Sequence, residues 1–88
     1  MSKQRDKLVE LGFEDAMVFD GPDFDSAIIG TTQDGRVVYC YDLMLKKLVV
    51  EDFYTEEEAA EFIDFNTIRT IPYMGEKAPV VIFNISEF

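Results

Sequence analysis

Residues 26–41 read Ser26-Ala27-Ile28-Ile29-Gly30-Thr31-Thr32-Gln33-Asp34-Gly35-Arg36-Val37-Val38-Tyr39-Cys40-Tyr41. The segments 26–31 and 36–41 are rich in the β-branched and aromatic residues that suit a pleated strand. Asp34-Gly35 lies between them, and both residues tolerate the positive φ that a tight hairpin turn demands. The stretch therefore predicts a β-hairpin.

Two more apolar runs extend the predicted sheet. Residues 16–19 precede the strong turn signal Asp20-Gly21-Pro22-Asp23, and with the hairpin they give a meander of three antiparallel strands. Residues 79–85 are almost continuously apolar, which is typical of a strand at the centre of a sheet. The sequence thus predicts an antiparallel sheet of about four strands.

Two segments flanking the hairpin have helical periodicity. Ser2 can cap a short helix that carries Leu8 and Leu11 and ends at Gly12. Asp42 is the expected N-cap of a second helix. The apolar stripe of that second helix comprises Leu43, Met44, Leu45, Leu48 and Val49.

A third helix is expected after Thr55. Thr55 and Glu58 have the spacing of a capping box, in which each side chain bonds to the backbone amide of the other residue. Residues 71–75 (Ile71-Pro72-Tyr73-Met74-Gly75) are expected to break the helix. Its apolar face comprises Ala59, Phe62, Ile63 and Asn66.

The composition fits one small folded domain. Of the 88 residues, 48 % are hydrophobic and 14 % are aromatic, which is too apolar for an intrinsically disordered chain. The single cysteine, Cys40, excludes an internal disulfide, and its strand position predicts a buried, inert thiol in a reducing cytosol. No apolar run approaches the roughly 20 residues of a membrane span, and no signal segment follows Met1. We expect a soluble cytoplasmic protein with one α+β domain over residues 1–88, its two or three helices packed on one face of the sheet.

The charge balance narrows the class of partner. The chain has 18 acidic and 8 basic residues and no histidine, for a formal net charge of −10. Such a surface repels phosphate backbones and anionic membranes and attracts basic proteins, especially those that bind nucleic acid. Direct contact with nucleic acid or membrane is not expected.

The usual residues for catalysis are missing. Without histidine, the Ser-His-Asp and Cys-His arrangements are excluded, and the commonest general base near neutral pH is absent. Gly21, Gly30 and Gly35 are spaced for turns and not for a phosphate-binding loop. We predict that the protein is not an enzyme and uses no cofactor.

Acidic residues are the remaining candidates for function. Seven of the fourteen residues from Glu51 to Asp64 are Asp or Glu. Glu57, Glu61 and Asp64 fall at i, i+4 and i+7, so they form a ridge along the third helix. Carboxylates at this spacing can occupy a basic groove as phosphates do, or they can serve only to keep the domain soluble.

A second acidic group lies on a predicted loop. Its members are Asp20, Asp23 and Asp25, with Glu14 and Asp15 upstream. Oxygen ligands on a loop suit calcium or magnesium, but the EF-hand spacing is not met. We therefore predict no metal site and expect the loop to contact a basic partner. A metal-dependent enzyme is the third alternative, after the two functional hypotheses given below.

Aromatic residues and one arginine lie among these acids. The aromatic residues expected mostly in the core are Phe24, Phe53, Tyr54 and Phe65. An exposed Phe53-Tyr54 pair could instead anchor an interface. Arg69 is expected either to make an ion pair with Asp64 or Glu61 or to contact the partner of those acids.

Three segments of the chain resemble a known group of proteins. They are residues 19–24 (FDGPDF), 34–39 (DGRVVY) and 61–79 (EFIDFNTIRTIPYMGEKAP). Together they resemble small, acidic, functionally uncharacterised proteins from Firmicutes-type bacteria and from their phages and mobile elements. The resemblance implies a possible role among inhibitors of host defence nucleases, such as anti-CRISPR proteins, and it implies no individual functional residue.

Two functional hypotheses follow from the sequence. In the first, the protein binds and inhibits a basic nucleic-acid-handling protein, as a nucleic-acid mimic that contacts it through Glu57, Glu61, Asp64, the Asp20–Asp25 loop and Arg69. In the second, it is a non-enzymatic accessory or structural module, such as a homodimer, whose charge serves solubility.

Overall fold

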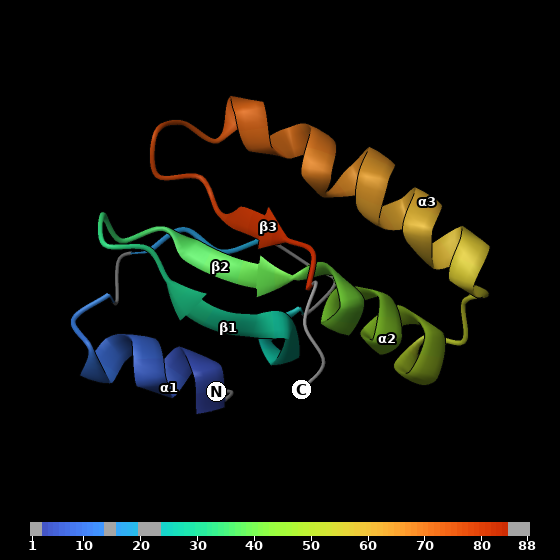
Figure 1. The fold of residues 1–88 in the computed structure, drawn as a ribbon, viewed down its shortest axis with the longest axis horizontal. Helices are drawn as coiled ribbons and strands as arrows, with labels where there is room; N and C mark the ends of the chain where they lie inside the picture. The colour runs from blue at the N-terminus through green and yellow to red at the C-terminus, as the bar shows by residue number, and fades with distance from the viewer. Residues whose placement is uncertain (1–2, 14–15, 20–23, 85–88) are drawn as a thin grey trace.

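A computed structural model of the chain describes residues 3–13, 16–19 and 24–84. Its elements are α1 (Lys3–Glu10), η1 (Asp25–Ala27), β1 (Ile28–Thr31), β2 (Val37–Cys40), α2 (Tyr41–Glu51), α3 (Glu56–Asn66), η2 (Ile68–Tyr73) and β3 (Val80–Ile82). The strands cross the middle of the molecule, with α1 beside β1, α3 beyond β3, and α2 continuing from the end of β2 (Figure 1). The α+β class predicted from the sequence is confirmed.

The predicted hairpin is present. β1 and β2 pair antiparallel, with Thr31 opposite Val37. The turn is closed by bonds from the Thr32 N–H to the Arg36 carbonyl at 2.8 Å and from the Gly35 N–H to the Thr32 carbonyl at 3.1 Å. Gly35 has a φ of 86°, which is the conformation for which glycine was expected. The strand begins at Ile28 and not at Ser26, because residues 25–27 form the 3₁₀ turn η1.

The third strand differs from the prediction. β3 pairs parallel with β2, Val38 opposite Val80, and the strand order is β1-β2-β3. The described sheet therefore has three strands and is mixed, and β3 lies at its edge and not at its centre. Parallel neighbours need a long crossover connection, and residues 41–79 supply it. The apolar run begins at the buried Pro79, and its exposed Phe83 contributes to a groove described below.

Residues 16–19 form no strand. Phe19 is buried, and its N–H donates a hydrogen bond to the Tyr39 hydroxyl at 3.1 Å. A side chain thus takes the place of the strand partner that the prediction required. The turn predicted at residues 20–23 lies outside the described residues.

The first two helices follow the predicted pattern with local differences. Leu8 is buried as expected, whereas Leu11 lies beyond α1 and is exposed. Gly12 ends the helix with a φ of 88°, and its predicted cap, Ser2, lies outside the described residues. α2 begins one residue before Asp42, because Cys40 is the N-cap.

The capping box of α3 is confirmed. The Glu58 N–H donates to the Thr55 hydroxyl at 3.1 Å, and the Thr55 N–H donates to the Glu58 carboxylate at 3.0 Å. Ala59 and Ile63 are buried, but Asn66, which was expected on the same face, is exposed. The end predicted for this helix at residues 71–75 is wrong, because α3 ends at Asn66 and the chain continues through Pro72 as the 3₁₀ helix η2.

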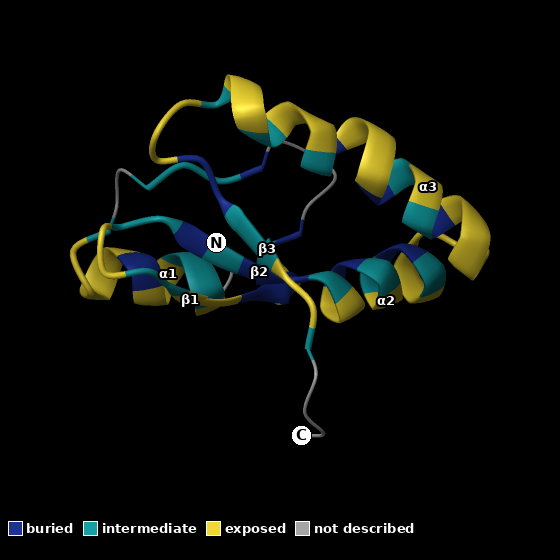
Figure 2. Cartoon of the chain, turned by 45° about the horizontal axis from the view of Figure 1, so that its top comes forward, coloured by how far each residue is buried: buried dark blue, intermediate teal, exposed yellow. Residues whose placement is uncertain are grey.

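One cluster of buried apolar side chains joins the sheet to all three α-helices. It includes Leu8 of α1, Tyr39 of β2, Met44 and Leu48 of α2, and Ile63 of α3. The buried stripes of α2 and α3 are turned toward each other, and their outer faces are exposed (Figure 2). Each helix in the described part of the chain is too short or too polar to cross a bilayer.

Candidate functional site

The acidic ridge, defined as Glu57, Glu61 and Asp64, lies on the exposed face of α3. Its direction is fixed by the two buried residues on the opposite face of the helix, Ala59 and Ile63. Within the described residues, no ion pair or hydrogen bond involves a ridge side chain. The three carboxylates are therefore presented to solvent, and no cation of residues 3–13, 16–19 or 24–84 is paired with them.

The ion pairs of the described chain lie elsewhere. They are Arg5–Asp25 at 2.9 Å, Lys7–Glu10 at 3.6 Å, Lys47–Asp52 at 2.9 Å and Lys77–Asp34 at 3.8 Å. Half of the eight basic side chains are thus engaged away from α3. None of these pairs includes a ridge carboxylate.

A groove runs beside the ridge, between α3 and the end of β3. This α3–β3 groove has a volume of about 340 Å³. Its lining residues are Tyr41, Ala60, Glu61, Asp64, Phe65, Ile68 and Phe83. Two of the three ridge carboxylates therefore border a surface that is otherwise mainly apolar and aromatic.

Phe83 gives the groove an exposed aromatic face. Its ring lies 4.7 Å from the Tyr41 ring, centroid to centroid, with 34° between the ring planes. This contact holds the ring against the start of α2, and yet 64 % of Phe83 is exposed. Large aromatic side chains that remain this accessible while held in one orientation are typical interface anchors.

Arg69 contacts an aromatic ring and not an acid. Its guanidinium carbon lies 4.3 Å from the centre of the Phe65 ring, within cation–π range. Within the described residues it makes no ion pair with Asp64 or Glu61, so the predicted intramolecular pair is wrong. Phe65 was expected mostly in the core, but 53 % of it is exposed.

The second acidic group is not brought to this site. Asp25 lies on η1, and its mostly buried carboxylate pairs with Arg5 of α1. Asp20, Asp23, Glu14 and Asp15 lie outside the described residues. Across the described ranges, no cluster of three or more acidic or cysteine side chains is arranged to hold a metal ion.

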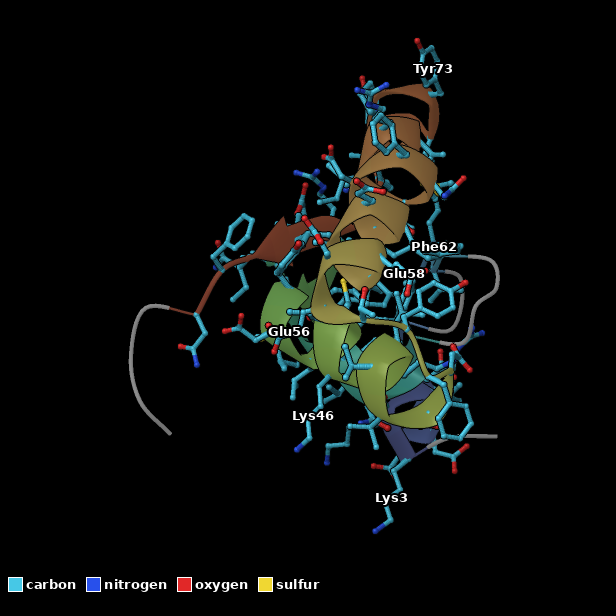
Figure 3. All side chains as sticks on the ribbon, turned by 90° about the vertical axis from the view of Figure 1, so that its right-hand side faces the viewer. Lys3, Lys46, Glu56, Glu58, Phe62 and Tyr73 are labelled. Atoms are coloured by element: carbon cyan, nitrogen blue, oxygen red, sulfur yellow. The ribbon has the colours of Figure 1, made fainter. Side chains whose placement is uncertain are left out.

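The Phe53-Tyr54 pair is divided between surface and core. Tyr54 is half-buried and meets Phe62 edge to face at 5.8 Å. Phe53 is 89 % exposed and has a φ of 60°, a left-handed conformation that is unfavourable for a residue with a side chain. Phe62, the partner of Tyr54, points to the same side of α3 as Glu58, whereas Glu56 points to the other side (Figure 3). Phe53 remains a candidate contact residue, and the buried Phe24 is confirmed as core.

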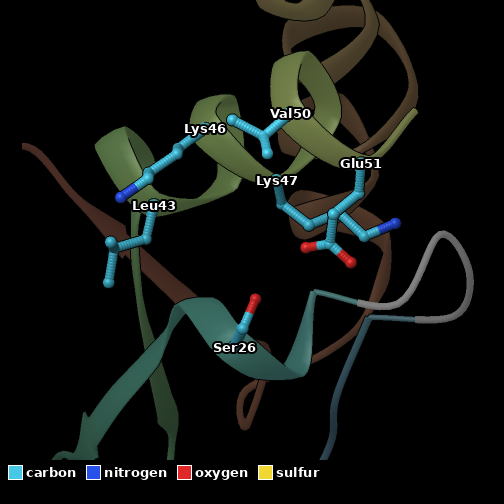
Figure 4. Close-up of a pocket in the computed structure, with 6 residues that line it drawn as sticks. All are labelled: Ser26, Leu43, Lys46, Lys47, Val50 and Glu51. Carbon is cyan, nitrogen blue, oxygen red and sulfur yellow. The ribbon is translucent and has the colours of Figure 1, made fainter. Parts of the chain in front are cut away.

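A smaller hollow of about 220 Å³ lies between η1 and α2. Its lining residues are Ser26, Leu43, Lys46, Lys47, Val50 and Glu51 (Figure 4). Lys47 is already paired with Asp52, and Glu51 adds a negative charge, so the hollow is poorly suited to an anion. Cys40 is buried, as expected.

A further groove of about 290 Å³ follows the outer side of β1. It lies between this strand and α1, and its exposed apolar residues include Leu11 and Ile29. β1 is an edge of the sheet, so the groove lies where another copy of the chain could pack.

Among the carboxyl groups of the described residues, two have a pKa below the ordinary value, and both serve local structure. Hydrogen bonds from the Thr55 backbone and side chain lower the pKa of Glu58. A hydrogen bond from the Thr32 hydroxyl, with a smaller contribution from the Lys77 ammonium, lowers the pKa of Asp34. These shifts belong to a helix cap and a hairpin turn and not to a reaction centre.

Sequence reasoning identified the ridge but missed the aromatic part of the groove. Tyr41 and Phe83 were treated as strand residues, and only a parallel β3 brings them together. The sequence signal that could have identified this part of the groove is Phe83, the aromatic residue in the last apolar run, residues 79–85. No family model matches the chain, and neither the curated proteins nor the solved structures include a match to it. The resemblance noted from the sequence stays a prediction.

Proposed function

We propose that this protein binds and inhibits a basic nucleic-acid-handling protein by occupying its phosphate-binding groove with the acidic ridge. The observation that carries the proposal is that Glu57, Glu61 and Asp64 share one exposed face and bind no cation of the described chain. Carboxylates left free in this way attract Lys and Arg side chains from a distance and can form charge-assisted hydrogen bonds with them on contact.

The spacing of the ridge supports mimicry of a phosphate backbone. Residues 57 and 64 are separated by about 10 Å along the helix axis, from a rise of about 1.5 Å per residue. One DNA strand carries a phosphate about every 3.4 Å along its axis, so the ridge covers roughly the length of three phosphate steps. The ridge therefore matches such a stretch of backbone in length and in sign of charge, and it complements a basic groove that accepts that backbone.

The sequence resemblance supplies the biological context of the proposed inhibition. The partner would be a host defence nuclease and the protein an anti-CRISPR-like inhibitor from a phage or mobile element, acting in the cytoplasm. The affinity is expected to fall steeply with salt, because complex formation replaces screened charges with ion pairs.

The test is competition for nucleic acid. The protein is immobilised and exposed to host lysate at low salt. A basic protein that it captures is eluted with rising salt, identified by mass spectrometry and purified. Its binding to nucleic acid is then titrated with this protein. We expect displacement of the nucleic acid by the wild type and loss of displacement by the Glu57→Lys, Glu61→Lys double variant.

The matched control reverses two exposed acids on other elements, Asp6→Lys with Glu76→Lys, which changes the net charge equally. Thermal melts establish that both double variants are folded. Equal inhibition by the wild type and the ridge variant, or equal loss in both variants, would reject the ridge as the inhibitory surface.

A second candidate function is a homodimeric accessory module. It is favoured by the groove along the edge strand β1, where Leu11 and Ile29 are exposed. Light scattering would detect such a dimer, which is expected to be insensitive to salt and to be dissociated by Ile29→Lys. A monomer at all concentrations would exclude it.

A further inference from the structure

We infer that the α3–β3 groove binds the side chain of an arginine presented by the basic partner, an inference that rests on the function proposed above. The ridge alone specifies only a positive surface. The groove adds a defined shape, because two ridge carboxylates border it and aromatic rings form its walls. The groove can therefore distinguish one kind of basic side chain from the others on the partner's surface.

The charge of the groove calls for a cation from another molecule. Glu61 and Asp64 line it, and none of the eight basic residues, all of which lie in the described ranges, is among its lining residues. Because 61 and 64 are three apart on α3, their carboxylates lie on neighbouring turns and can converge on one ligand. A cation between them would form two charge-assisted hydrogen bonds.

The aromatic walls favour a flat cation. The Phe83 ring is held by Tyr41 with much of its surface open, and Phe65 is exposed on the α3 side of the groove. The chain itself shows that Phe65 accepts a guanidinium, because Arg69 lies over that ring at 4.3 Å. The chemistry proposed for the partner's arginine is thus already present at the rim.

Arginine fits these features better than lysine. The guanidinium is planar and weakly hydrated, stacks on aromatic faces, and can donate to two carboxylate oxygens at once, whereas the ammonium of lysine is a compact, strongly hydrated charge. Ala60 and Ile68 give the groove an apolar surface on which the arginine methylenes can lie.

The experiment is an NMR titration of the ¹⁵N-labelled protein with three peptides, acetyl-Gly-Xaa-Gly-amide, in which Xaa is arginine, lysine or citrulline. Citrulline keeps the shape of arginine and removes its charge. We expect the arginine peptide to shift the amide signals of residues 60–68 and 83 at millimolar concentration. The lysine peptide should bind several-fold more weakly, and the citrulline peptide should cause no saturable shift.

Variants separate the groove from the rest of the ridge. Asp64→Asn is expected to weaken the arginine peptide by about three- to tenfold, from the loss of one partly exposed ion pair. Phe83→Leu keeps an apolar residue and removes the aromatic face, so the preference for arginine over lysine should disappear. The matched control is Glu57→Gln, which removes a ridge charge outside the groove and should leave peptide binding within about twofold of the wild type.

The outcomes distinguish this inference from the proposed function. No saturable shift with the arginine peptide, equal shifts with all three peptides, or equal weakening by Glu57→Gln and Asp64→Asn would overturn the arginine groove. Any of these together with ridge-dependent displacement of nucleic acid would leave the proposed function standing. Arginine-selective binding without displacement of nucleic acid would retain the groove and reject inhibition.

Discussion

The Tyr39 hydroxyl accepts a hydrogen bond from the Phe19 backbone N–H at 3.1 Å, and the two rings lie 4.7 Å apart. Tyr39 is 1 % exposed, so this bond lies in the core. Tyr39→Phe keeps the ring and leaves a buried N–H without its acceptor. We expect the free energy of unfolding, measured by urea denaturation, to fall by about 1–3 kcal/mol.

Tyr73→Phe is the matched control for that variant. It removes the same atom from a side chain that is 90 % exposed, and its stability should equal that of the wild type. Equal stability of all three proteins would show that the Tyr39 hydroxyl does not hold residue 19 in place.

The capping box predicts a pair of variants at position 55. Thr55→Ala removes the acceptor for the Glu58 N–H at the start of α3, and we expect a loss of about 1 kcal/mol in the free energy of unfolding. Thr55→Ser retains a hydroxyl and should stay close to the wild type. A serine variant as unstable as the alanine variant would assign the effect to the lost methyl group.

The same cap makes stability depend on pH. Hydrogen bonds from Thr55 lower the pKa of Glu58 from its ordinary value of 4.5, so the folded state favours the ionised carboxylate. Its contribution is therefore fully present above that value and is lost as the pH falls through the lower, folded-state pKa. Thermal melts of the wild type and Glu58→Gln should differ most at neutral pH and converge on acidification. A difference in melting temperature that increases at low pH would contradict the stabilising role of the ionised Glu58.

The backbone at Phe53 predicts an unusual order of stability. Its φ of 60° is unfavourable for any residue with a Cβ and comfortable for glycine. Phe53→Gly should therefore be more stable than Phe53→Ala by about 0.5–1 kcal/mol, measured by chemical denaturation. Alanine equal to or above glycine would show that the local conformation is not left-handed in solution.

Local sequence signals were sufficient where the structure is determined locally. Asp34-Gly35 specified the hairpin, and Thr55 with Glu58 specified the start of α3, because each feature depends on bonds within a few residues. Residues 16–19 were misread as a strand because burial of Phe19 requires only an apolar side chain. An apolar run in the sequence does not indicate whether its backbone pairs with another strand.

The site was predictable only in part for a related reason. Helical periodicity placed Glu57, Glu61 and Asp64 on one face of a predicted helix, and the structure has them exposed on α3. The groove beside them depends on contacts between α2, α3 and β3, and a single sequence does not reveal that β3 pairs parallel with β2. The open aromatic face of Phe83 follows from that pairing.

The crossover between β2 and β3 also has a consequence for the local stability of the sheet. Joining Val80–Ile82 to β2 closes a loop that contains two α-helices and the 3₁₀ helix η2, whereas β1 and β2 close across a short turn. Closing the longer loop costs more chain entropy, so this short edge strand should open to hydrogen exchange more readily than the hairpin. When it detaches, Phe83 leaves Tyr41 and the groove is lost. A bound ligand must therefore slow deuterium uptake at residues 80–82 while leaving the amides of β1, on the far side of β2, unchanged, so that the edge strand beside the groove reports occupancy of the helix face.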